Sequence, residues 1–146
     1  MNKIIAIIPA RGGSKSIPKK NIVNLCGYPL IAYSIAAAKL TKSIERIIVS
    51  TDDQKIAQVA KRYGAEVPFL RPKKFARDNS PDTEFMLHVI KWLKKKESFI
   101  APYLVLLRPT TPLRNPQCIE KAIQKILNCP KSTSLCSAEK IHISPY

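Results

Sequence analysis

The sequence has no apolar run long enough to cross a membrane. Its longest nearly apolar stretch, 29–38, has about half of the ~20 residues that a membrane-spanning helix needs. The apolar residues near the start are interrupted by Pro9 and Arg11, before they reach the length of a secretory signal. We therefore expect no membrane association, and we interpret residues 3–8 as a core β-strand.

Cysteine motifs are also missing. The four cysteines are separated by 92, 11 and 7 positions, which gives no CxxC pair and no spacing typical of a metal site. This usage is typical of free thiols in a reducing compartment, so we expect a cytoplasmic protein without a disulfide framework. The cysteines are Cys26, Cys118, Cys129 and Cys136.

Histidine is scarce too. The sequence has only two, His88 within a predicted helix and His142 near its end, and we expect both to be structural or solvent-facing. No Ser/His/Asp or Cys/His arrangement for nucleophilic catalysis is evident in the sequence.

Acidic residues are few relative to basic ones. Ten Asp and Glu stand against 25 Lys and Arg, a formal net charge of +15 that is spread over both halves of the chain. Such a surface attracts anions, from free nucleotides to nucleic acid, although a lysine-rich proteome would give the same composition. Aromatic residues make up only 7% and fall on predicted core positions, so we expect no specific nucleic-acid partner.

Glycine is rare, and its placement is informative. The four glycines form neither GxxxxGK[ST] nor GxGxxG, so the sequence does not support a P-loop kinase or a dinucleotide dehydrogenase. Gly12 and Gly13 are adjacent in a predicted loop, 10–21, where backbone N–H groups can approach a phosphate closely. Three cations and a hydroxyl accompany them: Arg11, Lys15, Lys20 and Ser14. We predict an anion site here, the alternative being a solvated basic loop.

Strand and helix patterns alternate along the chain. β-Branched apolar runs predict strands, and apolar residues at i, i+3, i+4 and i+7 predict helices. The predicted strands cover 3–8, 44–51, 65–70, 103–107 and 133–137. The predicted helices cover 29–40, 53–63, 80–96 and 115–126. This alternation indicates an α/β fold with a mostly parallel sheet, helices on both faces, and a single domain over 1–146.

Polar residues precede three of these helices. Asp52 or Asp53 is predicted to cap the second helix, Ser80 the third, and Asn115 stands where the fourth begins. Because capping already explains the adjacent aspartates, we favour it over metal ligation.

Six short segments occur in a recognisable order. The most specific are IPARGGSKSIPKKN at 8–21 and LLRPTTPLR at 106–114. Between them come four motifs that sugar nucleotidyltransferases share more widely: GYPLI at 27–31, VSTD at 49–52, YGAEV at 63–67 and LRP at 70–72. Together these segments resemble the CMP-sialic acid synthetases, or acylneuraminate cytidylyltransferases, over most of the chain.

The resemblance implies a Rossmann-like, GT-A-like nucleotidyltransferase fold and a CTP-dependent enzyme. CMP would pass from CTP to the anomeric hydroxyl of a nine-carbon 2-keto sugar acid, with release of pyrophosphate, in the synthesis of cell-surface polysaccharides. It also implies Mg2+ as cofactor and a homodimer at full length. The family's metal-holding aspartates lie on a later strand, so we expect them beyond Tyr146. The chain would then be the nucleotide-binding N-terminal part of a truncated domain.

Two other functions remain open from the sequence. One is another sugar nucleotidyltransferase, such as a 3-deoxy-manno-octulosonate cytidylyltransferase. The other is a non-catalytic nucleotide-binding module.

The resemblance also assigns roles to residues of the first loop. Arg11, Ser14, Lys15 and Lys20 match the triphosphate-binding residues, with Arg11 and Lys20 as the expected catalytic cations and Gly12 and Gly13 beside them. Asn21 and Arg71 match residues that read the cytosine edge or the nearby ribose. Acceptors for the cytosine amino group are expected around 76–80, with Ser80 among the substrate-binding residues. Arg71 could instead be a salt-bridge partner.

A second polar cluster is expected in 108–114. Thr110 and Thr111 form a rigid hydroxyl-bearing turn, and Arg108 is suited to bidentate pairing with a sugar carboxylate. Many sialic acid members have Gln where Arg108 stands, and this departure favours a legionaminic or pseudaminic acid type. The alternative for Arg108 is an ion pair at the end of a strand.

Overall fold

A three-stranded parallel sheet forms the centre of the molecule. The computed structural model describes residues 3–14 and 16–138, and its sheet contains β1 (Ile4–Pro9), β4 (Arg46–Ser50) and β5 (Tyr103–Leu106). The strand order is β4-β1-β5, so the middle strand β1 pairs in parallel with both neighbours. The carboxyl ends of all three strands therefore meet at one edge of the sheet, where the loops that follow them come together.

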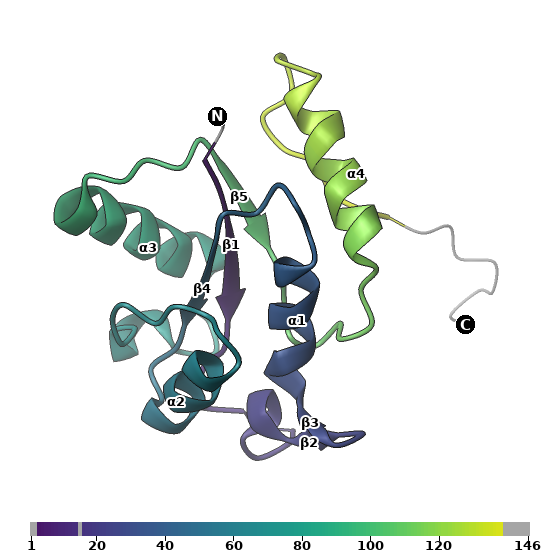
Figure 1. The fold of residues 1–146 in the computed structure, drawn as a ribbon. Helices are drawn as coiled ribbons and strands as arrows, with labels where there is room; N and C mark the ends of the chain where they lie inside the picture. Colours follow the sequence, from purple (N-terminus) through teal and green to yellow (C-terminus); the bar gives the residue numbers. More distant parts are fainter. Residues whose placement is uncertain (1–2, 15, 139–146) are drawn as a thin grey trace, which may run out of the picture.

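Helices cover both faces of this sheet (Figure 1). α1 (Leu30–Lys39) and α2 (Gln54–Arg62) pack on one face, and α3 (Asp82–Glu97) packs on the other. α4 (Pro116–Leu127) follows β5 and adds Ile119 to the cluster beneath α1 and α2. The predicted α/β organisation is confirmed, and each predicted helix end lies within two residues of the observed one.

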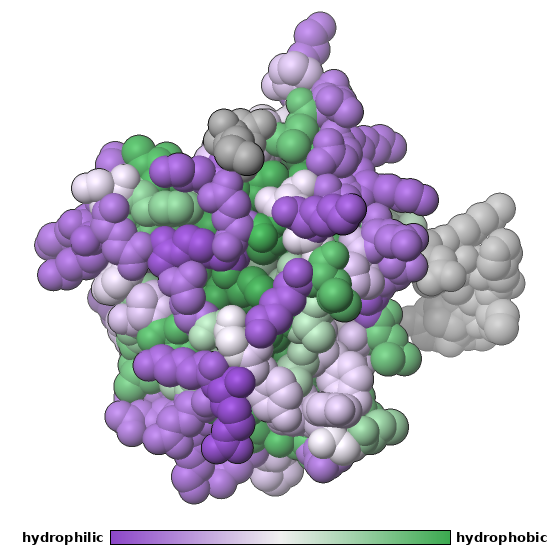
Figure 2. Space-filling model, viewed as in Figure 1, coloured by the Kyte–Doolittle hydropathy of each residue, from purple (hydrophilic) through white to green (hydrophobic). Residues whose placement is uncertain are grey.

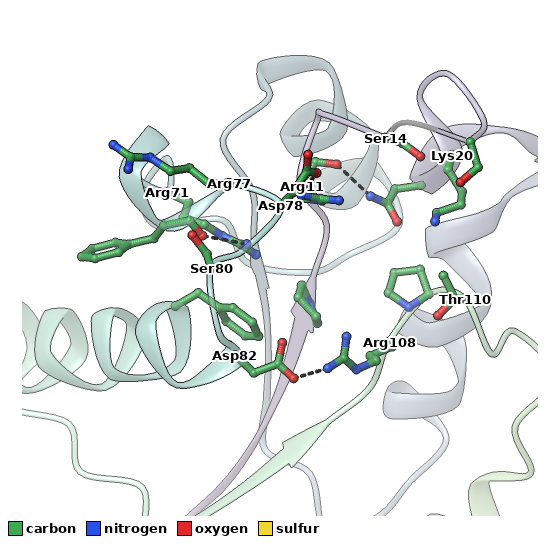
Figure 3. Close-up of a pocket in the computed structure, with 16 residues that line it drawn as sticks. Arg11, Ser14, Lys20, Arg71, Arg77, Asp78, Ser80, Asp82, Arg108 and Thr110 are labelled. Atoms are coloured by element: carbon green, nitrogen blue, oxygen red, sulfur yellow. Dashed lines mark hydrogen bonds and ion pairs between the residues drawn. The ribbon is translucent and has the colours of Figure 1, made fainter.

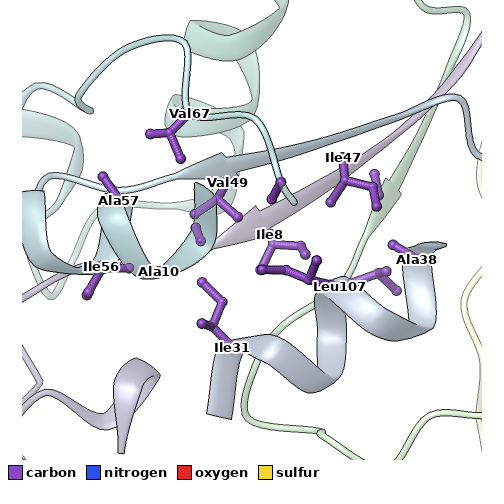
Figure 4. Packing of buried hydrophobic residues seen from close by; sticks show 14 residues of the cluster. Ile8, Ala10, Ile31, Ala38, Ile47, Val49, Ile56, Ala57, Val67 and Leu107 are labelled. Carbon is purple, nitrogen blue, oxygen red and sulfur yellow. The ribbon is translucent and has the colours of Figure 1, made fainter. Parts of the chain in front are cut away.

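The middle strand is buried on both faces, which explains its continuous apolar sequence. Ile8 packs with Ile31 of α1 and Ile56 of α2 in one cluster (Figure 4). Ile7 points the opposite way and packs with Phe85 of α3. Alternate residues of a strand point to opposite faces, so a strand covered by helices on both sides has no position left for a polar side chain.

Two predicted strands are not formed. In 65–70 only Glu66 makes a parallel bridge, to Ile48, because Pro68 has no N–H with which to continue a ladder. The predicted strand at 133–137 is wrong. This mostly exposed segment has no regular structure, since its Ser, Thr and Cys side chains supply little apolar surface to bury.

The structure contains a short hairpin that the sequence analysis did not predict. β2 (Asn24–Leu25) pairs antiparallel with β3 (Tyr28–Pro29) through Cys26 and Gly27, which have φ values of 49° and 92°. Two successive positive φ angles define the tight turn that fits hairpin twist. Two single-turn 3-10 helices, η1 (Lys20–Ile22) and η2 (Lys73–Phe75), lie in the loops after β1 and before α3.

The helix caps only partly follow the prediction. The Asp53 carboxylate caps α2 by accepting from the backbone N–H groups of Lys55 and Ile56 at 2.7 and 3.0 Å. Asn115 caps α4. Ser80 does not cap α3, because its hydroxyl donates to the backbone oxygen of Lys74 at 3.1 Å.

The surface is mainly hydrophilic on the face shown in Figure 2, with smaller apolar areas between the charged side chains. The four cysteines all lie among the described residues, where they are free and exposed. Among the described helices, none combines the length and the apolar character that crossing a bilayer requires.

Candidate functional site

A cavity of about 510 Å³ opens at the carboxyl end of the sheet (Figure 3). Its walls come from the loop after β1, the segment before α3, the first turns of α3, and the loop after β5. The side chains lining it are Pro9, Arg11, Ser14, Ser16, Lys20, Asn21, Arg71, Phe75, Arg77, Asp78, Ser80, Asp82, Phe85, Arg108, Pro109 and Thr110. The cavity thus occupies the place where parallel α/β sheets bind ligands.

Positive charge predominates in the lining. Five cations, Arg11, Lys20, Arg71, Arg77 and Arg108, stand against two carboxylates, Asp78 and Asp82. An excess of three positive charges in a concave site favours a polyanionic ligand.

Arg11 and Asn21 are joined on one side of the cavity. The Asn21 amide donates to the backbone oxygen of Arg11 at 2.9 Å, and Asn21 is 7% exposed. The Arg11 guanidinium pairs with Asp78 at 2.6 Å, which connects the first loop to the segment before α3. Asn21 therefore holds the chain at Arg11, while its position on the lining leaves it within reach of a ligand.

The two adjacent glycines, Gly12 and Gly13, lie in different environments. The Gly12 amide donates to the Asp52 carboxylate at 2.8 Å, so this N–H points toward the loop after β4. Gly13 is open, since a Cβ atom there would meet nothing within 4 Å. The Ser14 hydroxyl lines the cavity, is buried, and has no hydrogen-bond partner among the described residues. Lys15 lies outside the described residues.

Arg71 is the most buried cation of the site, with 5% of its surface exposed. Its guanidinium donates to the hydroxyl and the backbone oxygen of Ser50, at 3.0 and 2.5 Å, and to the Phe75 oxygen at 3.5 Å. It also lies over the Phe85 ring, 4.6 Å from the centroid. Burial lowers the pKa of Arg71 to about 10, opposed by Asp52 and Asp82, so the side chain stays charged at neutral pH.

The Arg108 side chain forms an ion pair and is not an unpaired cation. Its guanidinium donates to the Asp82 carboxylate at the start of α3, and both side chains are partly exposed. Thr110 lines the cavity, whereas Thr111 does not. The Thr111 oxygen instead accepts from Arg114, which stabilises the turn. Burial and the nearby Arg108 lower the pKa of Arg114.

The structure thus brings most of the predicted residues to one cavity and adds others. Three further lining residues, Arg77, Asp78 and Asp82, were not predicted as site residues, although they are charged and follow the LRP motif within ten positions. His88 is outside the lining and packs against Phe69 and Phe75, with ring centroids 4.6 and 5.6 Å apart. Burial, with Arg71 and Lys74 nearby, lowers its pKa, which fits the predicted structural role. His142 lies outside the described residues.

The described residues do not supply a metal site. No group of three His, Cys, Asp or Glu side chains converges in 3–14 and 16–138. The two carboxylates of the cavity are paired with Arg11 and Arg108, so they do not fit the ligand set of a divalent cation.

The chain is similar to known proteins over most of its length. The family model described as cytidylyltransferase matches residues 5–144. The chain is 39% identical over 143 residues to the CMP-N,N'-diacetyllegionaminic acid synthase of Legionella pneumophila, covering 98% of this chain and 60% of that protein. It is 40% identical over 125 residues to a pseudaminic acid cytidylyltransferase of Campylobacter jejuni, covering 86% and 53%.

A solved structure shares the fold. The CMP:2-keto-3-deoxy-manno-octonic acid synthetase complexed with CTP superimposes with a TM-score of 0.73 at 23% identity, covering 88% of this chain and 49% of that one. The chain thus spans between half and three fifths of the length of these proteins.

Proposed function

The chain belongs to the cytidylyltransferase family, and from this we propose that it is the CTP-binding part of an enzyme that makes a CMP-linked nine-carbon sugar acid. The observation that carries the proposal is the cationic cavity at the carboxyl end of the sheet, lined by Arg11, Lys20 and Arg71. A triphosphate needs several fixed positive charges, and five cations line this one cavity.

In the proposed reaction, the anomeric hydroxyl oxygen of the sugar acid attacks the α-phosphorus of CTP. A bond forms between these two atoms, the bond from the α-phosphorus to the oxygen bridging to the β-phosphorus breaks, and pyrophosphate leaves. The hydroxyl proton is released. Negative charge grows on the departing phosphates, so Arg11 and Lys20 favour the step by neutralising that charge.

The sugar acid is a legionaminic or pseudaminic acid type in this proposal, because the similar proteins bear those names and Arg108 replaces the Gln of many sialic acid members. Arg108 would exchange its ion pair with Asp82 for the carboxylate of the sugar. Mg2+ and a homodimer are further parts of the proposal that rest on the family resemblance, and a cytoplasmic location is a further part that rests on the cysteine usage.

We expect the chain to bind CTP at least about tenfold more tightly than UTP or ATP, because uracil presents a carbonyl where cytosine has an amino group. Isothermal titration calorimetry of the 146-residue chain with each nucleotide measures this preference. Equal affinity for CTP and UTP would contradict a cytidine-selective site, and no binding of any nucleotide would contradict the proposal as a whole.

Because Asp78 pairs with Arg11, we expect the chain to bind CTP more tightly when Asp78 is neutralised. Both side chains are about one third exposed, so the pair is worth at most ~1 kcal/mol. Asp78→Asn removes a carboxylate that competes with phosphate for Arg11, and we expect up to about fivefold tighter CTP binding at low salt. Titration at low and high salt is the measurement, with Asp53→Asn as a control for the loss of one acidic charge. Weaker binding of CTP by Asp78→Asn would show that Asp78 orients Arg11 for the ligand.

A further inference from the structure

A hydrogen bond joins two loops that are far apart in sequence. The Gly12 amide donates to Oδ1 of Asp52 at 2.8 Å, across 40 positions of the chain. Both residues follow paired strands, since Pro9 at the end of β1 is in register with Ser50 at the end of β4. Parallel pairing therefore places the start of the glycine loop directly beside Asp52.

The two loops are also in close contact at this point. A Cβ atom on Gly12 would lie 2.9 Å from the Cβ of Asp53, which real Cβ atoms essentially never do. Gly12 is thus required for the approach of the two loops, and its amide is occupied by Asp52. At Gly13, by contrast, a Cβ atom would have open space around it.

The glycine loop is fixed from two sides. Asn21 holds the backbone oxygen of Arg11, and Asp52 holds the next amide, that of Gly12. Beyond these anchors lies Ser14, which borders the cavity and whose buried hydroxyl has no partner among the described residues. An unpaired buried hydroxyl costs free energy unless a ligand pairs with it, so the direction of the loop at Ser14 matters for the ligand.

Asp52 itself does not line the cavity. It is near the site, because it is one of the charges that act on the pKa of Arg71. A carboxylate near a triphosphate would repel it, so any favourable effect of Asp52 on binding has to come through its hydrogen bond to Gly12.

We propose that Asp52 is a positioning residue for the triphosphate, which acts by holding the Gly12 amide and thereby the course of the loop through Gly13 and Ser14. The inference rests on the proposed CTP site. Its specific consequence is a dependence on phosphate number, since a loop that contacts the phosphates contributes more to binding CTP than to binding CMP.

The test uses Asp52→Ala and Asp52→Asn in the full 146-residue chain, titrated with CTP and with CMP. Alanine removes the acceptor, and we expect about a tenfold loss of CTP affinity with a smaller loss for CMP. Asparagine keeps an oxygen at the same position and removes the charge, so we expect its CTP affinity to stay within about threefold of the unmodified chain.

Asp53→Ala is the matched control. It removes the neighbouring carboxylate and the cap of α2 but keeps the Cβ atom against which Gly12 packs. We expect a lower midpoint of urea unfolding and an unchanged ratio of CTP to CMP affinity.

Three other results would overturn either the proposed function or the positioning role of Asp52. An unmodified chain that binds no CTP overturns the proposed function. A chain that binds CTP, with Asp52→Ala equal to it or weakened equally for CTP and CMP, overturns the positioning role and leaves the function standing. If Asp52→Asn loses as much CTP affinity as Asp52→Ala, the hydrogen bond to Gly12 is not the operative interaction, and the inference is again overturned.

Discussion

Arg71→Met is expected to weaken CTP binding by about a hundredfold or more while changing the free energy of unfolding by less than about 1 kcal/mol. The lowered pKa, about 10 against 12.5, means that keeping this buried guanidinium charged costs roughly 3 kcal/mol. Its three hydrogen bonds, to the Ser50 hydroxyl and to the backbone oxygens of Ser50 and Phe75, return roughly 1 to 1.5 kcal/mol each. These contributions nearly cancel, so we infer that the buried charge is retained for binding.

Urea unfolding and CTP titration of the same variant test the two halves of this prediction separately. Arg71→Lys keeps the charge but cannot direct several donors at Ser50 and Phe75, so we expect it to recover only part of the CTP affinity. Arg77→Ala is the matched control, because Arg77 lines the same cavity but is exposed. A loss of several kcal/mol of stability in Arg71→Met, with CTP affinity unchanged, would assign Arg71 a purely structural role.

Not all strands could be predicted equally well from the sequence. The strands at 3–8, 44–51 and 103–107 were predictable because each must be apolar to be buried by helices on the sheet. The segment 65–70 looked similar, yet it forms a single bridge, because one proline is enough to stop a ladder. The segment 133–137 has only one residue of high β propensity, Thr133, and no partner strand among the described residues, so it forms no strand.

Site residues were predictable where a motif identified them and not where a loop conformation decides. The motif at 8–21 indicated Arg11 and Lys20, and both line the cavity. The pairing of Arg11 with Asp78 depends on how the segment after Arg71 turns back across the sheet edge, which no local pattern specifies. The same holds for the contact between Gly12 and Asp52, whose residues are 40 positions apart.

Replacing Arg11 and Lys20 together by alanine is expected to have the largest effect on binding. Each lost charged contact should weaken CTP binding by about ten- to a hundredfold, so independent contacts would multiply to about a hundred- to ten-thousandfold. Arg11→Ala also leaves the Asp78 carboxylate in the cavity without its Arg11 partner, which adds repulsion toward the phosphates. We therefore expect Arg11→Ala to be the more damaging single variant.

A double-mutant cycle, with CTP affinity measured for both single variants and the double variant, separates the possible arrangements. If Arg11 and Lys20 bind the same phosphate, the double loss is smaller than the product of the single losses; if they bind different phosphates, the losses multiply. Lys19→Asn is the control, because Lys19 is exposed, does not line the cavity, and has a φ of 52° that Asn tolerates.

Adding Asp78→Asn to Arg11→Ala should recover part of the affinity, since it removes the repulsion and not the missing contact. A double variant of Arg11 and Lys20 that binds CTP as the unmodified chain does would place the triphosphate elsewhere. A different anion would then be the expected ligand of the cavity, because its excess of three positive charges favours one.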